Sequence, residues 1–214
     1  MISAHLAYAY PELILAIGAL ALLVVGAFMP KQTGLVGGAS VLVLLAAAVA
    51  SATQPFGVAF SGGLISDAAA TFSKVAIYVA SAVAIPLGQP WFERRGVKNF
   101  EYPVLILLAA LGMGMMASSG DLISLYVGVE LHSLALYVMA AMHRDNAKAS
   151  EAGLKYFVLG ALSSGLLLYG ASLIYGFAGS TLFSEIAAAA GNEANTGLLF
   201  GLVFLICGLA FKVS

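Results

Sequence analysis

Residues 121–142 read DLISLYVGVELHSLALYVMAAM, an apolar segment of helix length with a carboxylate near its middle. A helix needs about 20 mostly apolar residues to cross the roughly 30 Å hydrocarbon core of a bilayer. An ionised Glu130 at that depth costs at least about 2.5 kcal/mol, so a residue of this kind is functional by default and has a partner. The segment therefore predicts a membrane helix and makes Glu130 the first candidate site residue.

The rest of the chain has the composition of an integral membrane protein. Of the 214 residues, 62% are hydrophobic and 9% are charged, whereas soluble domains carry about 25% charged residues. We expect an all-α, polytopic helix bundle that forms a single membrane domain over residues 1–214. Six complete membrane helices and an incomplete seventh are expected at 11–29, 34–52, 67–87, 102–117, 121–142, 151–177 and 196–214.

The two ends of the chain carry their own expectations. Residues 198–214 stay apolar almost to the last position and contain no helix cap or polar tail, so we expect the N-terminal part of a longer protein. Residues 1–10 lack a cationic region, and the apolar run that follows has membrane-spanning length. The first helix is therefore expected to be retained rather than cleaved as a signal peptide.

The basic residues of the expected loops are distributed unevenly. The loops after the first, third and fifth helices contain Lys31, Arg94, Arg95, Lys98, Arg144 and Lys148. The N-terminal segment and the other loops contain no Lys or Arg. The positive-inside rule therefore predicts that the N-terminus lies on the outer side of the membrane.

Charge and cysteine content argue against nucleic-acid binding and against a redox centre in this chain, and one glycine motif needs a separate interpretation. The net charge of −1 argues against nucleic-acid binding, which needs a clustered basic surface. Cys207 is the single cysteine and can build neither a disulfide nor an iron–sulfur cage. The stretch GMGMMA at 112–117 matches a dinucleotide-binding pattern, but that pattern needs a strand-to-helix turn. In a membrane helix we interpret it as small residues for close helix packing.

Polar side chains share one face of the expected 121–142 helix. They are Tyr126, Glu130, Ser133 and Tyr137, spaced i, i+4, i+7 and i+11. Glu130 lies about 13 Å from the start of this segment, too deep to reach water, so a proton-transfer role is favoured over a purely structural one. His132 points to a different side of the helix, where packing through a hydrogen bond is favoured over a proton relay.

Two further lysines are candidates with an alternative left open. Lys74 shares a stripe with Asp67, Thr71, Tyr78 and Ser81, and either snorkels to the membrane boundary or is functional. Lys155 follows Glu151 at i, i+4, the order that favours a surface ion pair. Small residues near Lys155 would also draw a neighbouring helix close, so function and a simple ion pair remain open.

Lys212 differs from the other lysines because the apolar stretch before it has no Asp or Glu to neutralise it. Its partner must come from elsewhere in the fold, or it must lose its proton. Two opposite charges about 6 Å apart interact by about 3 kcal/mol at an effective dielectric near 20. Movement of Lys212 relative to Glu130 is therefore expected to load or unload a proton.

These residues lie in recognisable motifs. The stretches SGDLISLYVGVELHSLALYVMAAMHRD (119–145) and SEAGLKYFVLGALSSGLLLYGASLIYGFAGST (150–181) resemble subunit N of the proton-pumping NADH-quinone oxidoreductase, respiratory complex I. The resemblance extends to SDAAATFSKVAIY (66–78) and to GLAFKVS (208–214). It implies an antiporter-like membrane subunit, related to subunits of multisubunit cation/proton antiporters, of which this chain would be the first half.

The resemblance also implies roles for residues and partners. Glu130 and Lys212 would form the proton-transfer pair, Lys155 would be a further lysine tied to pumping, and His132 stands where the family often has an amide. No cofactor would bind this chain, because NADH, flavin, iron–sulfur clusters and quinone belong to partner subunits. Other membrane subunits, including antiporter-like ones, would be its neighbours in the lipid bilayer of the bacterial inner membrane.

Two alternatives to a complex I subunit remain. A subunit of a multisubunit cation/proton antiporter would share the helical fold and the Glu and Lys pair. A structural membrane spacer would have no transport role, and its intramembrane charges would be dispensable. The polar stripes on the third and fifth helices argue against the spacer, because apolar faces would cost less in a membrane.

Overall fold

Helices make up most of the computed structural model, which describes residues 5–29, 32–95, 100–192 and 195–213. The long helices form where apolar runs of spanning length occur, because a backbone in hydrocarbon must satisfy its hydrogen bonds internally. They are α2 (Tyr10–Phe28), α3 (Thr33–Thr53), α4 (Ala68–Arg94), α5 (Glu101–Ala117), α6 (Leu122–Ala140), α7 (Ala147–Ala178), α8 (Phe183–Asn192) and α9 (Thr196–Val213).

Six of these helices are long and apolar enough to cross a membrane, judged by length and composition over the described residues. They are α2, α3, α4, α6, α7 and α9. Helix α5 is also apolar but is shorter, with 17 residues. The expected class, an all-α multi-pass membrane protein, is confirmed.

Two helices reach further than the sequence pattern indicates. Helix α4 continues past Pro86 and Pro90 to Arg94, although its expected end was residue 87. Helix α7 begins at Ala147 because the Asn146 side chain caps it and accepts hydrogen bonds from the backbone of Lys148 at 3.0 Å and of Ala149 at 3.4 Å. Arg94 and Lys148 therefore lie in helix ends rather than in loops, and Lys31 and Lys98 lie outside the described residues.

A small hairpin that the sequence analysis did not predict connects α3 and α4. Strand β1 (Gly57–Ala59) pairs antiparallel with β2 (Leu64–Ser66), and the 3₁₀ turn η1 (Phe60–Gly62) joins them. The hairpin is fastened to the α5–α6 loop, because the Ile65 N–H donates to the Ser118 carbonyl at 2.8 Å. That loop is held in turn to the α7–α8 connection, where the Phe183 N–H donates to the Gly120 carbonyl at 3.1 Å. One end of the bundle is thus closed by backbone hydrogen bonds between three connections.

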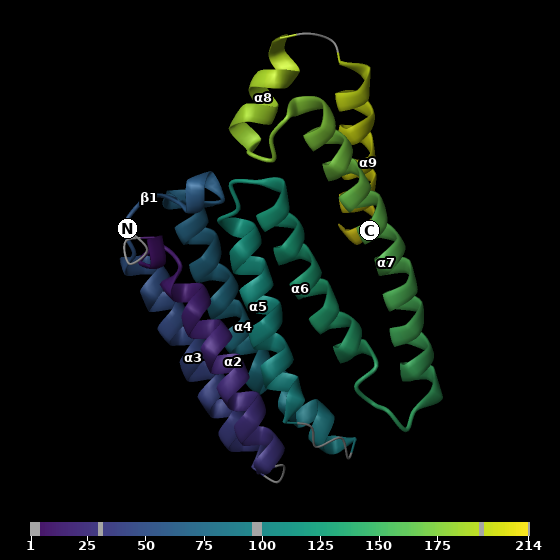
Figure 1. Ribbon diagram of the computed structural model, residues 1–214. Coiled ribbons are helices and arrows are strands. Elements are labelled where there is room, and N and C mark those ends of the chain that lie inside the picture. The colour runs from purple at the N-terminus through teal and green to yellow at the C-terminus, as the bar shows by residue number, and fades with distance from the viewer. Residues whose placement is uncertain (1–4, 30–31, 96–99, 193–194, 214) are drawn as a thin grey trace.

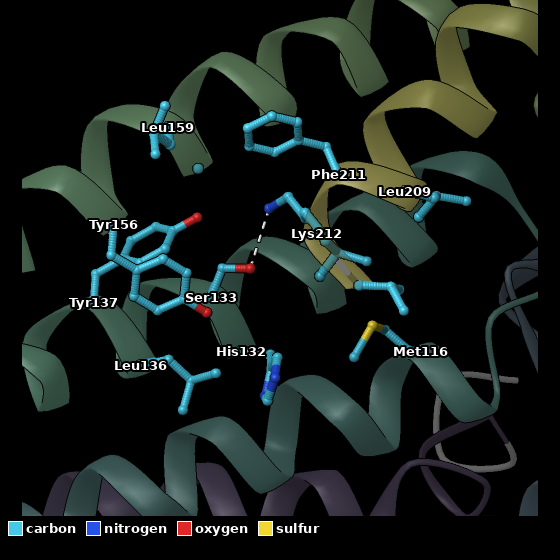
Figure 2. A pocket seen from close by; sticks show the side chains of 13 residues that line it. Met116, His132, Ser133, Leu136, Tyr137, Tyr156, Leu159, Leu209, Phe211 and Lys212 are labelled. Atoms are coloured by element: carbon cyan, nitrogen blue, oxygen red, sulfur yellow. Dashed lines mark hydrogen bonds between the residues drawn. The ribbon is translucent and has the colours of Figure 1, made fainter.

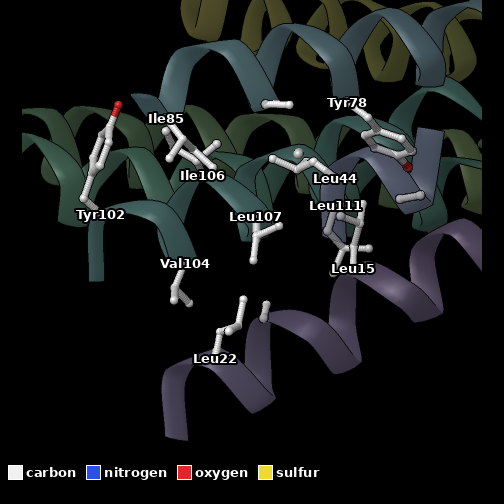
Figure 3. Packing of buried hydrophobic residues seen from close by; sticks show 14 of the residues in the cluster. Leu15, Leu22, Leu44, Tyr78, Ile85, Tyr102, Val104, Ile106, Leu107 and Leu111 are labelled. Carbon is white, nitrogen blue, oxygen red and sulfur yellow. The ribbon is translucent and has the colours of Figure 1, made fainter. Parts of the chain in front are cut away.

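The helices are arranged as a bundle with a separate hairpin of helices at its side (Figure 1). Helices α2 to α6 lie side by side, α7 contacts α6, and α9 lies against α7. A buried cluster that includes Leu15, Leu44, Tyr78 and Leu107 joins α2, α3, α4 and α5 (Figure 3). The order of contacts leaves α6 between the main bundle and the α7–α9 pair.

Glycines set the distance between neighbouring helices at two crossings. A Cβ atom on Gly112 of α5 would lie 2.6 Å from the Gly128 carbonyl oxygen of α6. A Cβ atom on Gly201 of α9 would lie 2.9 Å from the Ile174 backbone nitrogen of α7. Both positions need glycine because the facing backbone occupies the space of a side chain. The packing interpretation of the 112–117 motif is therefore confirmed at Gly112.

Candidate functional site

Glu130 of α6 and Lys212 of α9 form an ion pair inside the helix assembly. The Lys212 Nζ atom lies 2.7 Å from the Glu130 Oε1 atom and donates a second hydrogen bond, at 3.1 Å, to the Ser133 hydroxyl oxygen. The Lys212 side chain is 11% exposed and the Glu130 side chain is 22% exposed. Glu130 and Ser133 lie one turn apart on α6, so the lysine head contacts the polar face that the sequence spacing predicted.

A third helix contributes to the same pair through Ser164 of α7. The Ser164 hydroxyl is hydrogen-bonded both to the Glu130 Oε1 atom and to the Gly160 carbonyl oxygen, the latter at 2.9 Å. A serine hydroxyl has a single proton, so it can donate to only one of these two acceptors at a time. Ser164 is one of the small residues near Lys155 that were expected only to pack against a neighbouring helix, and a Ser on the helix that follows a carboxylate in an apolar run is the signal that could have identified it.

The ion pair borders a cavity of about 710 Å³ between α6, α7 and α9. Figure 2 shows its polar lining, which includes His132, Ser133, Tyr137, Tyr156 and Lys212. The rings of Tyr137 and Tyr156 meet edge to face with centroids 4.7 Å apart. The rest of the lining is apolar, so the polar side chains beside the charged pair are the places in this cavity where water can bind.

His132 lines the same cavity as Ser133 and Lys212, whereas Glu130 is not among the residues that line it. The placement of His132 on a different side of α6 from Glu130 stays a prediction. The cavity is wide enough to span two faces of α6, which a spacing rule for one isolated helix cannot show. The His132 Nδ1 atom is buried and has no hydrogen-bond partner among the described residues.

Lys155 is placed apart from this cavity lining. Its Nζ atom lies 2.5 Å from the Glu151 Oε1 atom, and the two side chains are 70% and 61% exposed. This is the i, i+4 ion pair that the sequence spacing indicated. The small residues nearby do bring α7 close to α6, since a Cβ atom on Gly153 would lie 2.5 Å from the Ala141 Cβ atom at the end of α6. The structure nevertheless does not bring Lys155 to Glu130.

Lys74 is buried completely, and the snorkelling interpretation of this residue is wrong. Its Nζ atom lies 2.6 Å from the Glu12 Oε1 atom of α2, and the lysine side chain is 0% exposed. Snorkelling requires the charged head to reach the interface, whereas Lys74 faces the neighbouring helix. Glu12 was not predicted from the sequence, because it lies in the first turn of α2, where a carboxylate is usually solvated.

The described residues show no cluster that would hold a metal ion. No three His, Cys, Asp or Glu side chains gather in the part of the chain that the structure covers. Cys207 is a free, exposed thiol. The chemistry that this arrangement offers is therefore that of paired charges, hydroxyls and an imidazole around a cavity.

Residues 119–214 match the protein family described as "NADH:quinone oxidoreductase/Mrp antiporter, TM". NADH-quinone oxidoreductase subunit N of Caulobacter sp. (strain K31) is 66% identical over 216 residues, which cover 99% of this chain and 45% of the relative. The same subunit of Maricaulis maris (strain MCS10) is 55% identical over 219 residues and covers 100% of this chain and 45% of the relative.

Two solved structures have the same fold. A chain of respiratory complex I from Thermus thermophilus with bound aureothin superposes with a TM-score of 0.76 at 30% identity, over 94% of this chain and 43% of that chain. A chain of the membrane-bound sulfane sulfur reductase, an archaeal respiratory membrane complex, superposes with the same TM-score of 0.76 at 24% identity, over 95% and 44%. The second likeness shows the fold alone.

The two curated relatives have the same name and are both about twice as long as this chain. The chain spans about 45% of the length of the curated relatives that it matches. Over nearly all of its own residues it aligns with proteins of one name, at 66% and 55% identity in the two cases above. The chain therefore belongs to the NADH-quinone oxidoreductase subunit N family.

Proposed function

We propose that this chain moves protons as part of a membrane subunit of NADH-quinone oxidoreductase, with Glu130 and Lys212 as a switchable ion pair. The observation that carries the proposal is the 2.7 Å contact between these two charges, which lie 82 residues apart in the chain. Charges inside membrane helices are costly and are retained for transport. The names of the relatives support the assignment to this enzyme complex.

The pair can respond to small movements of α9. At an effective dielectric near 20, opposite charges attract by about 6 kcal/mol at 2.7 Å and by about 3 kcal/mol at 6 Å. Opening the contact by a few ångströms therefore removes about 3 kcal/mol of the attraction that stabilises the charged forms of Glu130 and Lys212. This change favours proton transfer from Lys212 to Glu130 or to water in the adjoining cavity. The work needed is comparable with about 2.3 kcal/mol per charge for each 100 mV of membrane potential.

Serine hydroxyls position the pair for this exchange. Ser133 accepts a hydrogen bond from Lys212, and Ser164 contacts the Glu130 carboxylate. When Lys212 withdraws, the Ser164 hydroxyl remains as a hydrogen-bond partner of the Glu130 carboxylate. His132 is the secondary candidate for passing a proton across the cavity. Lys155 is a further candidate that would need a conformational change or another chain to join this route.

The redox chemistry is assigned to partner subunits in this proposal. NADH oxidation, flavin, iron–sulfur clusters and quinone reduction would belong to other subunits of the complex. Other membrane subunits, antiporter-like ones among them, would lie beside this chain in the bacterial inner membrane. Its N-terminus would face the periplasm, as the distribution of Lys and Arg predicts.

The test is Glu130→Gln in the assembled complex, studied in membrane vesicles. This change keeps the shape of the side chain and removes its charge, so proton pumping is expected to fall at least tenfold while the complex still assembles. Proton uptake per NADH oxidised is the measurement. The matched control is Glu185→Gln on α8, where the glutamate is exposed and pumping should be unchanged. Full pumping by the Glu130→Gln complex would refute the proposal.

A cation/proton antiporter subunit is the second candidate function. The family description that matches residues 119–214 covers both the oxidoreductase and the Mrp antiporter. Sodium efflux that persists without NADH-dependent activity, together with purification free of NADH dehydrogenase subunits, would favour the antiporter. Copurification with NADH dehydrogenase activity and pumping without sodium would favour the oxidoreductase.

A spacer without a transport role makes a separate prediction. In that case, replacing Glu130, Lys155 and Lys212 together with neutral residues would alter assembly at most. The proton-transfer proposal instead predicts an assembled complex whose quinone reduction is no longer coupled to pumping at this subunit. Pumping per NADH in the triple variant, measured against the amount of assembled complex, separates the two.

A further inference from the structure

A second ion pair is buried in a different set of helices from Glu130 and Lys212. Glu12 in the first turn of α2 meets Lys74 of α4 at 2.6 Å, and the side chains are 11% and 0% exposed. Removing two charges from water costs several kcal/mol per ion, and apolar residues of similar volume usually pack at least as stably. Packing of α2 against its neighbours therefore does not require an ion pair, because apolar side chains at these two positions would serve as well.

The pair lies among polar atoms that have few protein partners. The Thr71 and Tyr78 hydroxyls are buried without a hydrogen bond to any described residue, and the same holds for the Glu12 Oε2 atom. Apart from their mutual contact, Glu12 and Lys74 make no hydrogen bond in the described part of the chain. Each unsatisfied buried polar group costs about 1–3 kcal/mol, and native proteins meet such needs with ordered water.

The unsatisfied groups follow one face of α4. Thr71, Lys74 and Tyr78 are spaced i, i+3 and i+7, so they form a continuous stripe along the helix. The Tyr78 hydroxyl also lies close enough to the Glu12 carboxylate to interact with its charge. Apart from the contact with Glu12, the ammonium and the two hydroxyls lack partners among the described residues, so they are three neighbouring groups to which water can bind.

A cavity connects Glu12 with the end of the bundle. It has a volume of about 420 Å³ and is lined by Glu12, Ser118, Asp121 and Ser124 together with residues of the hairpin. Phe60 of the hairpin also lines this cavity and is 50% exposed, which places one wall at the surface. Under the predicted orientation, this end of the bundle faces the outer side of the membrane.

Few other titratable groups face this site. Asp121 lines the cavity, but its Oδ1 atom already accepts a hydrogen bond from the Ser124 N–H at 2.6 Å as the cap of α6. His5 contacts the hairpin at Phe60. Helix α3 contains no titratable residue, and the titratable residues of α5 lie in its first turn, whereas its last turn borders the cavity. Glu12 is therefore the carboxylate that joins the cavity to Lys74.

We propose that Glu12 and Lys74, with Thr71 and Tyr78, form a second, hydrated proton-exchange site reached through the cavity beneath the hairpin. A hydronium ion in the cavity gives its proton to the Glu12 carboxylate and leaves as water. The neutral Glu12 no longer holds the Lys74 ammonium, which releases one proton to water along the α4 stripe. Transfer of the Glu12 proton to the neutral Lys74 restores the pair, so one proton enters and one leaves.

The proposal rests on proton translocation by this chain and is tested by a double apolar replacement, Glu12→Leu with Lys74→Met, in the full membrane complex. Removing both charges keeps the volume and leaves no unpaired ion, so assembly and uncoupled NADH–quinone activity are expected to persist. Proton pumping per NADH should fall at least twofold. Wild-type pumping by this variant would make the pair structural and overturn the inference.

A matched control replaces a surface ion pair. Arg144 and Glu101 lie 3.7 Å apart, with the arginine side chain 80% exposed. The double change Glu101→Gln with Arg144→Gln is expected to leave pumping at the wild-type level. Glu130→Gln measured in parallel separates the two proposals. Loss of pumping with Glu130→Gln alone would reject only the Glu12 site, and no loss in either would reject the proposed function.

Chemical labelling of the wild-type complex gives a readout that does not depend on assembly of a variant. Dicyclohexylcarbodiimide enters apolar sites and reacts with a protonated carboxyl, which passes its proton to the reagent nitrogen while the carboxylate oxygen bonds to the central carbon. We expect Glu12 to be labelled, with a rate that rises as the outer pH is lowered. Mass spectrometry that finds no label on Glu12 at any pH would also overturn the inference.

Discussion

At the scale of single residues, the Glu130 Oε1 atom is the point at which three helices meet. Lys212 from α9 and Ser164 from α7 both contact this oxygen, and Lys212 also reaches Ser133 on α6. Each contact stabilises the charged carboxylate or its partner. The state of one proton is therefore tied to the relative positions of three membrane helices.

Ser164→Ala is expected to impair pumping more than it impairs assembly. A hydrogen bond to a charged group contributes about 1.5–3 kcal/mol, so its loss should slow proton transfer about tenfold or more. Ser172, an exposed serine on the same helix, supplies the matched control. Proton uptake by vesicles containing Ser164→Ala or Ser172→Ala should separate the two serines, and equal rates would show that the Glu130 contact is unimportant.

Lys155→Met is expected to leave stability almost unchanged. The Glu151–Lys155 pair is exposed, and such i, i+4 pairs contribute about 0.3–0.5 kcal/mol. Thermal unfolding of the purified complex should therefore stay within about a degree or two of wild type. Pumping measured on the same sample then reports the role of Lys155 itself, because a loss of pumping at unchanged stability cannot come from misfolding.

At the scale of elements, the position of α9 decides whether Lys212 reaches Glu130. Helix α9 contacts α7 closely along the face that contains Gly201 and Gly208. A Cβ atom on Gly208 would lie 2.8 Å from the Leu167 backbone nitrogen. Close approach of the two backbones therefore orients α9, and its last turn presents the lysine to α6.

Gly201→Ala is expected to displace α9 and weaken the ion pair. In an isolated helix this change would add about 1 kcal/mol of stability. Here the new methyl group would lie 2.9 Å from the Ile174 nitrogen, and overpacking of this kind costs about 1–3 kcal/mol. Pumping and thermal stability should both fall.

Gly165→Ala is the control for this element, because no atom lies within 4 Å of the added carbon. It should retain both pumping and stability. Equal behaviour of the two alanine variants would contradict the view that backbone contact between α7 and α9 sets the position of Lys212.

At the scale of the whole molecule, two groups of helices each contain an ion pair, one buried and one half-buried. Helices α2 and α4 hold Glu12 and Lys74, while α6 and α9 hold Glu130 and Lys212. Helix α5 contacts α2, α3 and α4 on one side and α6 on the other. Movement of α5 relative to α6 would therefore shift the two groups of helices relative to each other. The close crossing at Gly112 is the contact between α5 and α6.

The orientation of the molecule can be measured with single cysteines. In a Cys207→Ser background, Asp145→Cys in the α6–α7 loop is expected to react only with a membrane-impermeant maleimide added on the inner side. Glu185→Cys on α8 should react with the same reagent only from the outer side. Both positions are exposed, so access depends on the side of the membrane rather than on burial. The reverse pattern would show that the positive-inside prediction is wrong.

Much of the candidate site could be predicted from the sequence, and the missing part has a physical cause. Glu130 and Lys212 stood out because each is a charge within an apolar run, and the cost of such a charge does not depend on the fold. Glu12 and Ser164 were missed. Glu12 lies near a helix start, where a carboxylate is usually solvated, and serines are common in membrane helix interfaces for packing alone.

The hairpin and α8 were missed for a related reason. Residues 57–66 are too short for a periodic pattern, and backbone hydrogen bonds to other connections hold the hairpin in place. Residues 183–192 form a helix that is too short to cross a membrane, so a search for membrane-spanning runs passes over it. The N-terminal cap at Asn146 was readable from sequence but lies before the apolar run that was used to place α7. Helix ends are therefore set partly by local caps and partly by neighbours.

The sequence by itself determined that this is a helical membrane protein and which charges are expensive, because hydrophobic length and the cost of a buried charge are local properties. Only the tertiary structure decided the partners. Lys212 meets Glu130 across 82 residues, Lys74 meets Glu12 instead of water, and Lys155 pairs at the surface. Those outcomes depend on helix contacts of a few ångströms, which glycines and packed side chains set between segments far apart in the chain.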